Sequence, residues 1–304
     1  IISRLQEKQN LLTAKSFGKI NVTLEVMGRF PDGYHQIVSV MQAIELCDTM
    51  SFKPNSTQNI NFTCDMPVIQ NDDNLVFKAA YLLKQYSEYP YGVDIYLEKI
   101  IPIASGLGGG SSNAAVTLLT LCKLWDLNIK QDALNFLAKK IGSDVGFFLS
   151  DPSCLAELKG DTITPIKSMK PTNVVLIVPK IDLQEKTKNM YNGLSSKDYT
   201  DGKLSFKTAK LIQGGKPPAH YPMFNVFKDI AVARFPEVSI AEQAMIESGA
   251  SGVQLSGSGP SLFTFTTSIN ESKNISEKLT ALGYNPIISK KDLSYKKEEY
   301  RIEV

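Results

Sequence analysis

The chain has 304 residues, of which 43% are hydrophobic and 21% are charged, and its formal net charge is +2. This near-neutral balance does not fit a protein whose main partner is nucleic acid, and no run of about 18 to 20 apolar residues indicates a membrane span. The length exceeds the usual size of one compact core, which favours two lobes with a cleft between them.

The first half of the chain alternates strand and helix patterns. Residues 16–29 and 36–52 carry the alternating, β-branched pattern of strands, and Pro-Asp-Gly at 31–33 predicts a turn between them. Residues 72–87 begin with acidic capping residues and predict a helix. Residues 93–103 predict a strand that ends near Pro102, and an apolar helix is expected directly after Ser112.

The second half is predicted from the same signals. We expect helices over 131–141 and 240–250, a buried strand over 174–180 that opens the second lobe, and a long surface connection over the Ser-, Lys-, Gly- and Pro-rich residues 196–222. Residues 252–267 predict a strand, a glycine turn and a strand, and residues 300–304 a closing edge strand.

The cysteines and the N-terminal residues bear on the cellular compartment of the protein. The four cysteines are widely spaced and include no CxxC pair, which fits neither a zinc site nor a disulfide-rich secreted domain. The chain begins at Ile1 rather than methionine, and residues 1–15 lack the apolar core of a signal peptide. We therefore expect a cytoplasmic protein, or one of a plastid-like organelle if a transit peptide has been removed.

A glycine-rich segment carries the clearest chemical signal. Residues 106–113 read Gly-Leu-Gly-Gly-Gly-Ser-Ser-Asn and lie between a predicted strand and a predicted helix. Glycines let the backbone approach an anion closely, and the amides at a helix start point toward the same place, so a phosphate fits there. The segment matches neither GxxxxGK[ST] nor a GxGxxG followed by an acidic ribose ligand. A flexible linker is the other interpretation.

Two charged residues stand out, each with an ordinary alternative. Asp144 lies in a short polar segment before the apolar Phe-Phe-Leu run and fits a general base beside a reacting hydroxyl, although a turn or cap aspartate is equally consistent. Lys19 lies in a predicted strand, where a solvated face is the usual position of a lysine. The functional interpretation depends on the two residues acting together.

Tyr34 and His35 follow the Pro-Asp-Gly turn and offer a flat ring beside a hydrogen-bond donor and acceptor, which suits a nucleobase. An ordinary turn is the alternative, and no ligand at suitable spacing indicates a metal. The segment Ser256–Pro260 fits either a tight turn or a loop that closes over a phosphate.

Four segments, in this order and spacing, resemble the GHMP kinases: FGKINVTLEVMGRFPDGYH, IPIASGLGGGSSNAA, GSDVGFFL and LSGSGPS. The resemblance implies a two-lobed α+β GHMP kinase fold with the active site in the cleft. It also implies an ATP-binding and catalytic lobe over residues 1–168 and a substrate-binding lobe over residues 169–304. The RFPDGYH segment is most similar to the branch that phosphorylates the 2-hydroxyl of a cytidine diphosphate-linked polyol in the non-mevalonate, methylerythritol phosphate route to isoprenoids.

The resemblance implies roles for the residues that match the family's motifs. The expected catalytic residues are Lys19 and Asp144. The expected ATP-binding residues are Asn74, Lys99, Gly106, Leu107, Gly108, Gly109, Gly110, Ser111 and Ser112. The expected substrate-binding residues are Asn21, Tyr34, His35, Thr187, Tyr191, Gly257 and Ser258. The chain departs from the family pattern at Gly18, at Gly146 and around Asn225, and none of these changes removes an expected catalytic group.

The implied chemistry is phosphoryl transfer, which needs positioning and charge stabilisation. Asp144 is expected to take the acceptor's proton, with Lys19 beside it and Mg²⁺ carried in by ATP rather than held at a dedicated protein site. The expected partners are ATP and the cytidine-bearing polyol, with no nucleic acid and no membrane, and the protein is expected to be a monomer or weak homodimer. Two alternatives stay open: another GHMP enzyme, of the homoserine or mevalonate kinase type, and a non-catalytic nucleotide-binding regulator on the same fold.

Overall fold

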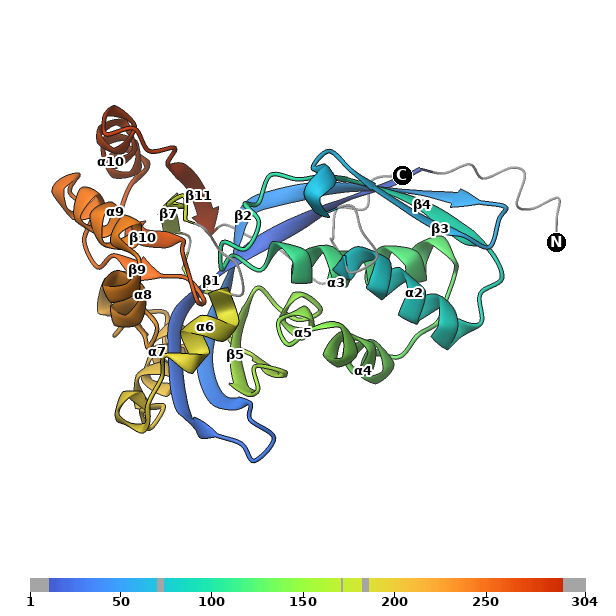
Figure 1. Cartoon of the computed structure of the whole chain (residues 1–304), viewed down its shortest axis with the longest axis horizontal. Coiled ribbons are helices and arrows are strands. Elements are labelled where there is room, and N and C mark those ends of the chain that lie inside the picture. Colours follow the sequence, from blue (N-terminus) through green and yellow to red (C-terminus); the bar gives the residue numbers. More distant parts are fainter. Residues whose placement is uncertain (1–10, 70–73, 171, 182–185, 292–304) are drawn as a thin grey trace.

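The structure is a computed structural model, and it is described over residues 11–69, 74–170, 172–181 and 186–291. Two sheets organise it (Figure 1). The larger contains seven strands: β1 (Leu12–Arg29), β2 (His35–Asn55), β3 (Ile60–Cys64), β4 (Gly92–Glu98), β5 (Ser153–Leu158), β6 (Thr162–Pro165) and β8 (Phe224–Asn225). The smaller contains four: β7 (Thr172–Ile177), β9 (Gln254–Leu255), β10 (Leu262–Thr266) and β11 (Ile287–Lys291).

Helices cover both sheets. Along the larger sheet lie α2 (Leu75–Ser87), α3 (Gly109–Leu124), α4 (Gln131–Ile141) and α5 (Val145–Phe148), as Figure 1 shows. The remaining helices are α6 (Lys186–Asn192), α7 (Lys203–Gln213), α8 (Lys228–Arg234), α9 (Pro236–Glu247) and α10 (Ile269–Ala281). Among the described residues there are also three single 3-10 turns: η1 (Pro67–Ile69), η2 (Ser196–Asp198) and η3 (Pro218–His220). None of the helices in the described ranges is long and apolar enough to cross a membrane.

The long strands β1 and β2 connect the two ends of the molecule. In the larger sheet the order is β3-β4-β2-β1-β8, and β5 pairs with β2 beside this path. The apolar side chains Leu24 and Val26 of β1 pack in one core with Phe227 and Met245 from the C-terminal half. Because β8 also joins the first sheet, the lobe boundary between residues 168 and 169 stays a prediction.

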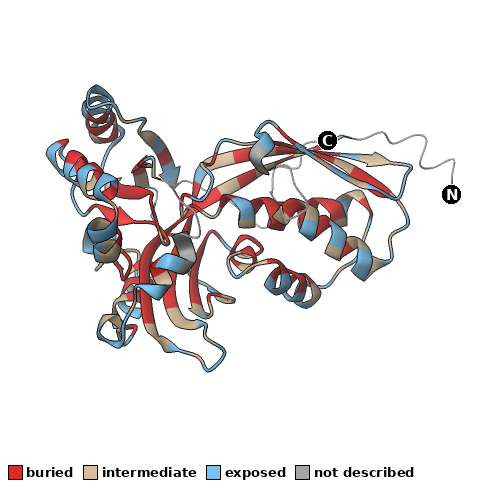
Figure 2. Ribbon diagram, in the orientation of Figure 1, coloured by how far each residue is buried: buried red, intermediate tan, exposed pale blue. Residues whose placement is uncertain are grey.

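Burial follows the faces of these elements (Figure 2). The core between the larger sheet and its helices includes Phe52 of β2, Leu97 of β4 and Leu118 of α3, each fully buried. Full burial of such a side chain contributes about 1.5–3 kcal/mol. This packing holds α3, and with it the glycine segment, against β1 and β2.

The pairing of β1 with β2 shifts register three times, between Phe17 and Gly18, between Asn21 and Thr23, and between Val26 and Gly28. Such irregularities bend a strand and change the direction of its side chains. Lys19 and Asn21 lie between two of the shifts and, two residues apart, on the same face of β1.

Several predicted elements differ from the observed ones. The predicted strand over 93–103 ends at Glu98, and α3 begins at Gly109, inside the glycine segment. The prediction of a long surface connection over 196–222 is wrong, because this segment contains η2, α7 and η3. Its helix α7 buries one face made largely of small side chains, Ser205, Thr208, Ala209 and Ile212, which gives little hydrophobic signal. The predicted strand over 300–304 lies outside the described residues.

Candidate active site

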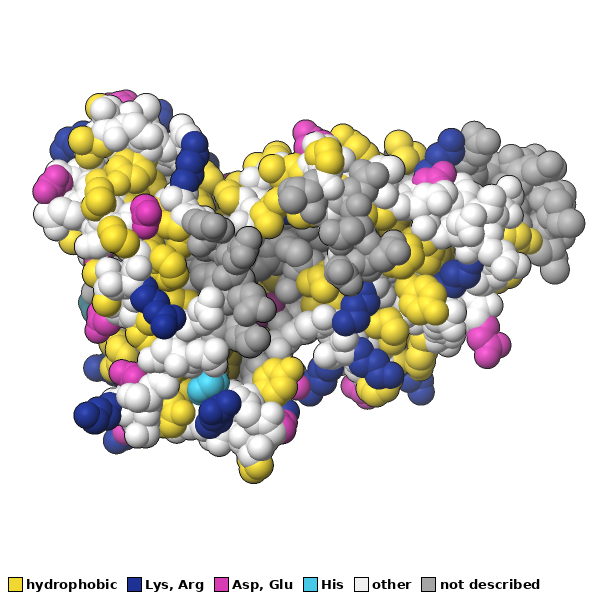
Figure 3. Space-filling model, in the orientation of Figure 1, with side chains coloured by type: hydrophobic (Ala, Val, Ile, Leu, Met, Phe, Trp, Pro, Cys, Tyr) yellow, Lys and Arg dark blue, Asp and Glu magenta, His cyan; other side chains and the backbone are white. Residues whose placement is uncertain are grey.

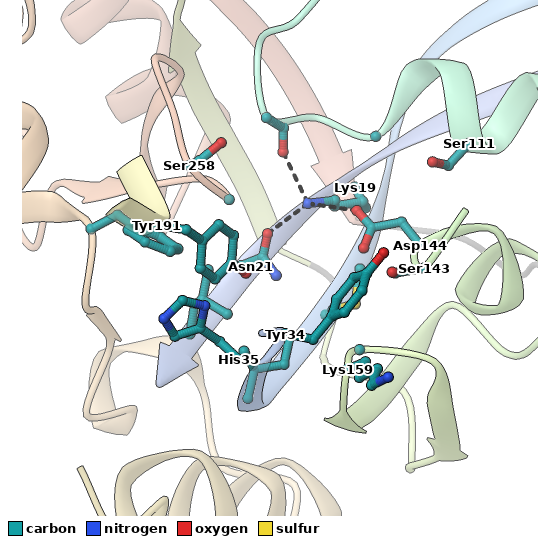
Figure 4. A pocket seen from close by; sticks show the side chains of 18 of the residues that line it. Lys19, Asn21, Tyr34, His35, Ser111, Ser143, Asp144, Lys159, Tyr191 and Ser258 are labelled. Atoms are coloured by element: carbon teal, nitrogen blue, oxygen red, sulfur yellow. Dashed lines mark hydrogen bonds and ion pairs between the residues drawn. The ribbon is translucent and has the colours of Figure 1, made fainter. Parts of the chain in front are cut away.

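Lys19 projects from β1 and is almost fully buried, with 3% of its surface exposed, so the alternative of a solvated strand lysine is wrong. Its Nζ donates to Asn21 Oδ1 at 2.7 Å and to the carbonyl of Gly106 at 3.0 Å (Figure 4). Its backbone N–H donates to the carbonyl of Leu107 at 2.8 Å. The glycine segment therefore holds this lysine from two sides.

Asp144 is at the N-cap position of α5, but its side chain makes no capping hydrogen bond. Its Oδ2 lies 3.4 Å from Lys19 Nζ, and 39% of its side-chain surface is exposed, against 4% for the lysine. The Asp144 carboxylate is thus accessible, whereas Lys19 is buried and held by Asn21 and Gly106. A buried cation beside an accessible carboxylate suits a group that must meet a substrate hydroxyl.

Two cavities meet at the glycine segment. The larger, about 940 Å³, is lined by Lys19, Asn21, Tyr34, His35, Asp144, Tyr191, Gly257 and Ser258 among others. The smaller, about 560 Å³, is lined by Asn74, Lys99, Gly109 and Gly110 among others. Four residues line both: Ala104, Gly106, Gly108 and Ser111. Nearly all the predicted site residues are therefore gathered on the two sides of one loop.

The glycine segment lines the two cavities mainly with its backbone. Gly108 has a φ of 72° and caps α3, whose first turn follows directly. Gly106 has a φ of 86°, and a side chain there would lie 2.2 Å from the carbonyl oxygen of Ser256. The start of a 16-residue helix presents free amides and the positive end of the helix dipole, which favours an anion.

The smaller cavity combines apolar walls with two anchored polar residues. Ile69, Leu75 and Ile103 supply apolar surface. Asn74 caps α2: its Oδ1 accepts from the N–H of Val76 at 2.9 Å and its Nδ2 donates to the carbonyl of Ile69 at 2.9 Å. Lys99 lies at the floor, where its Nζ is 2.8 Å from Asp48 Oδ2. A flat apolar ring beside an anionic group fits this cavity.

In the larger cavity, His35 is the centre of a group of aromatic rings. Its ring lies 4.9 Å from that of Tyr191 and 6.3 Å from that of Tyr199, and Tyr191 in turn packs edge-on against Phe227 at 4.7 Å. Burial lowers the pKa of His35, and the charge of Arg29 lowers it further. Burial raises the pKa of Tyr191, with a contribution from Asp144. Both rings therefore present neutral polar groups.

Tyr34 lies at the mouth of this cavity with 59% of its surface exposed. Asp32 Oδ1 accepts from its backbone N–H at 3.2 Å, and Lys159 Nζ lies 4.6 Å from the centre of its ring. Lys159 also pairs with Asp32. Lys159, Asp32 and Arg29 line the cavity but were missed in the sequence, where each is an ordinary charged residue in a turn or at a strand end.

The far wall comes from the C-terminal half. Gly257 and Ser258 line the larger cavity, and Asn225 anchors their turn, since its Nδ2 donates to the carbonyls of Leu255 and Gly257, each at 2.8 Å. Asn225 is 4% exposed. The departure from the family pattern around this asparagine therefore concerns a supporting residue behind the wall.

Two expected site residues, Leu107 and Ser112, line neither cavity, and a third, Thr187, has an undescribed side chain. Leu107 is fully buried and reaches the site only through its carbonyl. Ser112 is 1% exposed and lines neither cavity; its hydroxyl accepts a hydrogen bond from Ser16 Oγ at 2.8 Å. The backbone of Thr187 belongs to α6, but its side chain lies outside the described part of the chain.

Acidic, cysteine and histidine side chains are the usual protein ligands of a metal ion. Within the described ranges no group of three or more such residues could hold a metal ion. Charged side chains of both signs are interspersed with apolar ones on the face in Figure 3.

Comparison with known proteins decides the family. The family model for the GHMP kinases N terminal domain matches residues 74–151, and that for the C terminal domain matches residues 219–285. The 4-diphosphocytidyl-2-C-methyl-D-erythritol kinase of Dehalococcoides mccartyi is 36% identical over 275 residues, which cover 90% of this chain and 96% of the relative. The chain belongs to the GHMP kinase family. Like other GHMP kinases it is an ATP-dependent small-molecule kinase, so the alternative of a non-catalytic regulator is not supported.

Solved structures agree with this assignment. A crystal structure of 4-(cytidine 5'-diphospho)-2C-methyl-D-erythritol kinase superimposes with a TM-score of 0.78 and 28% identity, covering 91% of this chain and 98% of the other. A mevalonate kinase structure gives a TM-score of 0.62 at 14% identity, with 91% and 98% covered, which shows a shared fold alone. The predicted α+β GHMP kinase fold is confirmed.

Proposed function

We propose that this GHMP kinase transfers the γ-phosphoryl group of ATP to the 2-hydroxyl of 4-diphosphocytidyl-2-C-methyl-D-erythritol, in the methylerythritol phosphate route to isoprenoid precursors. The observation that carries the proposal is the Lys19–Asp144 pair, 3.4 Å apart, beside the loop at which the two cavities meet. The relative at 36% identity over most of the chain carries this enzyme's name and supports the choice of acceptor.

ATP takes the smaller cavity. Its base lies against the apolar wall that includes Ile69 and Ile103, and its phosphates face the amides at the start of α3. Asn74 and Lys99 lie along the same cavity. Mg²⁺ enters with the nucleotide as part of the substrate complex and neutralises charge on the phosphates.

The acceptor takes the larger cavity with its 2-hydroxyl at Asp144. The Asp144 carboxylate takes the hydroxyl proton, the acceptor oxygen bonds to the γ-phosphorus, and the bond from that phosphorus to the bridging oxygen of ADP breaks. Lys19, held by Asn21 and Gly106, keeps a positive charge beside the reacting oxygens. Because both groups are already in position, the protein contributes mainly orientation and electrostatics.

The cytosine end extends toward the aromatic group. Because its pKa is lowered, His35 is neutral at neutral pH and offers one donor and one acceptor, which is what a cytosine edge requires. Tyr34 at the mouth and Tyr191 inside give two flat surfaces for a base. Mevalonate and homoserine carry no base and make no use of these rings.

The direct test is ADP release measured with a panel of acceptors: the cytidine-bearing polyol, its uridine analogue, mevalonate and homoserine. We expect the cytidine compound to have the highest kcat/KM. A higher kcat/KM for mevalonate or homoserine would overturn the proposed acceptor while leaving the kinase assignment in place.

A further inference from the structure

Behind the nucleotide cavity lies a carboxylate that the reaction does not touch. Asp48 of β2 is fully buried, and its two oxygens accept four hydrogen bonds. Oδ1 accepts from the backbone N–H groups of Ile100 and Ile101 at 2.8 and 2.7 Å. Oδ2 accepts from Lys99 Nζ at 2.8 Å and from Asn113 Nδ2 at 2.9 Å. A buried charge is tolerated only with such a complete set of partners.

These partners belong to the segments on both sides of the glycine loop. Ile100 and Ile101 follow β4 and lead into the glycine segment, whereas Asn113 is the last residue of that segment and lies in the first turns of α3. Asp48 therefore joins the entrance of the loop to its exit. Lys99, the fourth partner, lines the nucleotide cavity itself, and its Nζ lies 3.0 Å from the point where a side chain on Gly109 would begin.

A second line of contacts runs from Asp48 to the serine that ends the loop. The same Nδ2 group of Asn113 that donates to Asp48 also donates to Ser16 Oγ at 2.8 Å. Ser16 Oγ then donates to Ser112 Oγ at 2.8 Å. Ser16 lies opposite Asp48 on the neighbouring strand and is fully buried. The direction of each bond is thus set by the one before it, from the carboxylate to Ser112.

We propose that Asp48 is a positioning residue for the nucleotide phosphates, acting through Lys99 on one side and through Asn113, Ser16 and Ser112 on the other. The inference rests on the proposed binding of ATP in the smaller cavity. Asp48 holds the Lys99 ammonium at the floor of that cavity and fixes the backbone on both sides of the loop. Without its charge, Lys99 loses its counter-ion and the loop amides lose their common anchor.

The experiment compares three variants by steady-state kinetics, calorimetric binding of a non-hydrolysable ATP analogue, and thermal melting. Asp48→Asn keeps the shape but removes the charge, and we expect the KM for ATP to rise about 10- to 100-fold while the acceptor KM stays within about twofold. Ser16→Ala removes the hydroxyl that joins Asn113 to Ser112 but leaves the four contacts of Asp48 in place. A rise of about 3- to 10-fold in the KM for ATP is expected, with little change in melting temperature.

Thr120→Val is the matched control. Thr120 lies in the same helix α3, is fully buried, and its hydroxyl has no hydrogen-bond partner in the described part of the chain. Its KM for ATP should equal that of the parent. Equal increases in the ATP and acceptor KM values for Asp48→Asn, or an unchanged KM for ATP in both Asp48→Asn and Ser16→Ala, would overturn the proposal. If Asp48→Asn does not fold, Ser16→Ala alone decides.

The role of Asp48 and the identity of the acceptor are tested by separate measurements. Affinity for the ATP analogue is measured without any acceptor, so the role of Asp48 is tested even if the parent does not phosphorylate the cytidine compound. A weakened affinity in Asp48→Asn and Ser16→Ala, with Thr120→Val unchanged, supports the positioning role. An unchanged affinity in the first two contradicts it, whichever acceptor the enzyme uses.

Discussion

On the nucleotide side of the site the polar side chains are buried and held by other elements, whereas on the acceptor side several lie on exposed turns. Asp48 is fully buried with four donors, and only 5% of the Lys99 side chain is exposed. Across the loop, the ion pair of Asp32 with Lys159 has 51% and 35% of its side-chain surfaces exposed, and Tyr34 is 59% exposed.

This difference indicates how each side acquires its geometry. The nucleotide side is fixed when the chain folds, since its contacts join β2, β4 and α3 in the interior. Exposed ion pairs contribute little to stability, so the acceptor mouth can adjust when a substrate arrives. Loss of a charged or tightly packed group on the first side should affect ATP binding and folding together, and changes on the second side should affect mainly acceptor binding.

The largest effect is expected where the two sides meet. Asp144→Asn removes the base but keeps the size of the side chain, so kcat should fall about 10²–10⁴-fold while ATP affinity hardly changes. Turnover is measured by ADP release and affinity by calorimetry. Asp161→Asn is the control, because Asp161 lines neither cavity. Its Oδ2 pairs with Lys139 Nζ at a distance of 3.3 Å. Near-normal turnover of folded Asp144→Asn would remove Asp144 from the mechanism.

A change on the nucleotide side should act nearly as strongly. A Cβ on Gly109 would lie 3.0 Å from both Ile101 Cγ2 and Lys99 Nζ, so Gly109→Val must displace the floor of the cavity. We expect ATP affinity to fall by about 10²-fold or more, with some loss of thermal stability. Gly28→Ala, whose Cβ would meet only Gln36 Oε1 at 3.9 Å, should bind ATP as the parent does. Equal affinity of Gly109→Val and parent would mean that the loop does not bind the phosphates.

The sequence predicted the nucleotide side in outline but not its support. The glycine pattern and its place before a helix identify the loop, because few other uses of four glycines fit between a strand and a helix. Asp48 gave no signal, since one aspartate in a run of strand residues usually faces water. Its burial depends on Lys99 and Asn113, which are 51 and 65 residues away in the chain.

The sequence pattern also gave a wrong start for the helix that follows the glycine segment. The helix was expected after Ser112 but begins at Gly109, because tertiary contacts with β1 and β2 outweigh the low helix propensity of two glycines. As a result Ser112 lies inside the helix and faces Ser16 rather than a cavity. The direction of a side chain in the first helical turn depends on the residue at which the helix starts. The sequence alone located that residue only to within about three positions.

On the acceptor side the exposed Tyr34 provides a smaller and more selective test. If its ring stacks on cytosine, Tyr34→Ala should cost about 1–3 kcal/mol of acceptor binding, which is about 5- to 150-fold in affinity. ATP affinity and melting temperature should stay at the parent values. Tyr81→Ala is the control, since Tyr81 is similarly exposed, at 49%, but lies on α2 outside both cavities. An acceptor affinity unchanged in Tyr34→Ala would place the base against Tyr191 instead.

The smallest effect concerns His35 and pH. Because burial lowers the pKa of His35 below its ordinary 6.5, the folded protein takes up this proton less readily than the unfolded chain does. Its neutral form therefore supports stability fully above the unfolded pKa, and stability falls as the pH drops through that value toward the folded pKa. Acceptor binding should weaken at lower pH, as the pH falls through the folded pKa, because only then does the folded ring become charged and lose the acceptor that a cytosine edge needs.

The measurement is the melting temperature and acceptor affinity of parent and His35→Gln between about pH 8 and pH 5. Glutamine keeps a donor and an acceptor without titrating, so its acceptor affinity should start lower but remain level where the parent's declines. The difference in melting temperature between the two should likewise change only below about pH 6.5, the ordinary pKa of histidine. Parallel curves for parent and variant over this whole range would show that His35 does not titrate in the site, and that its ring serves the acceptor side only by packing against Tyr191.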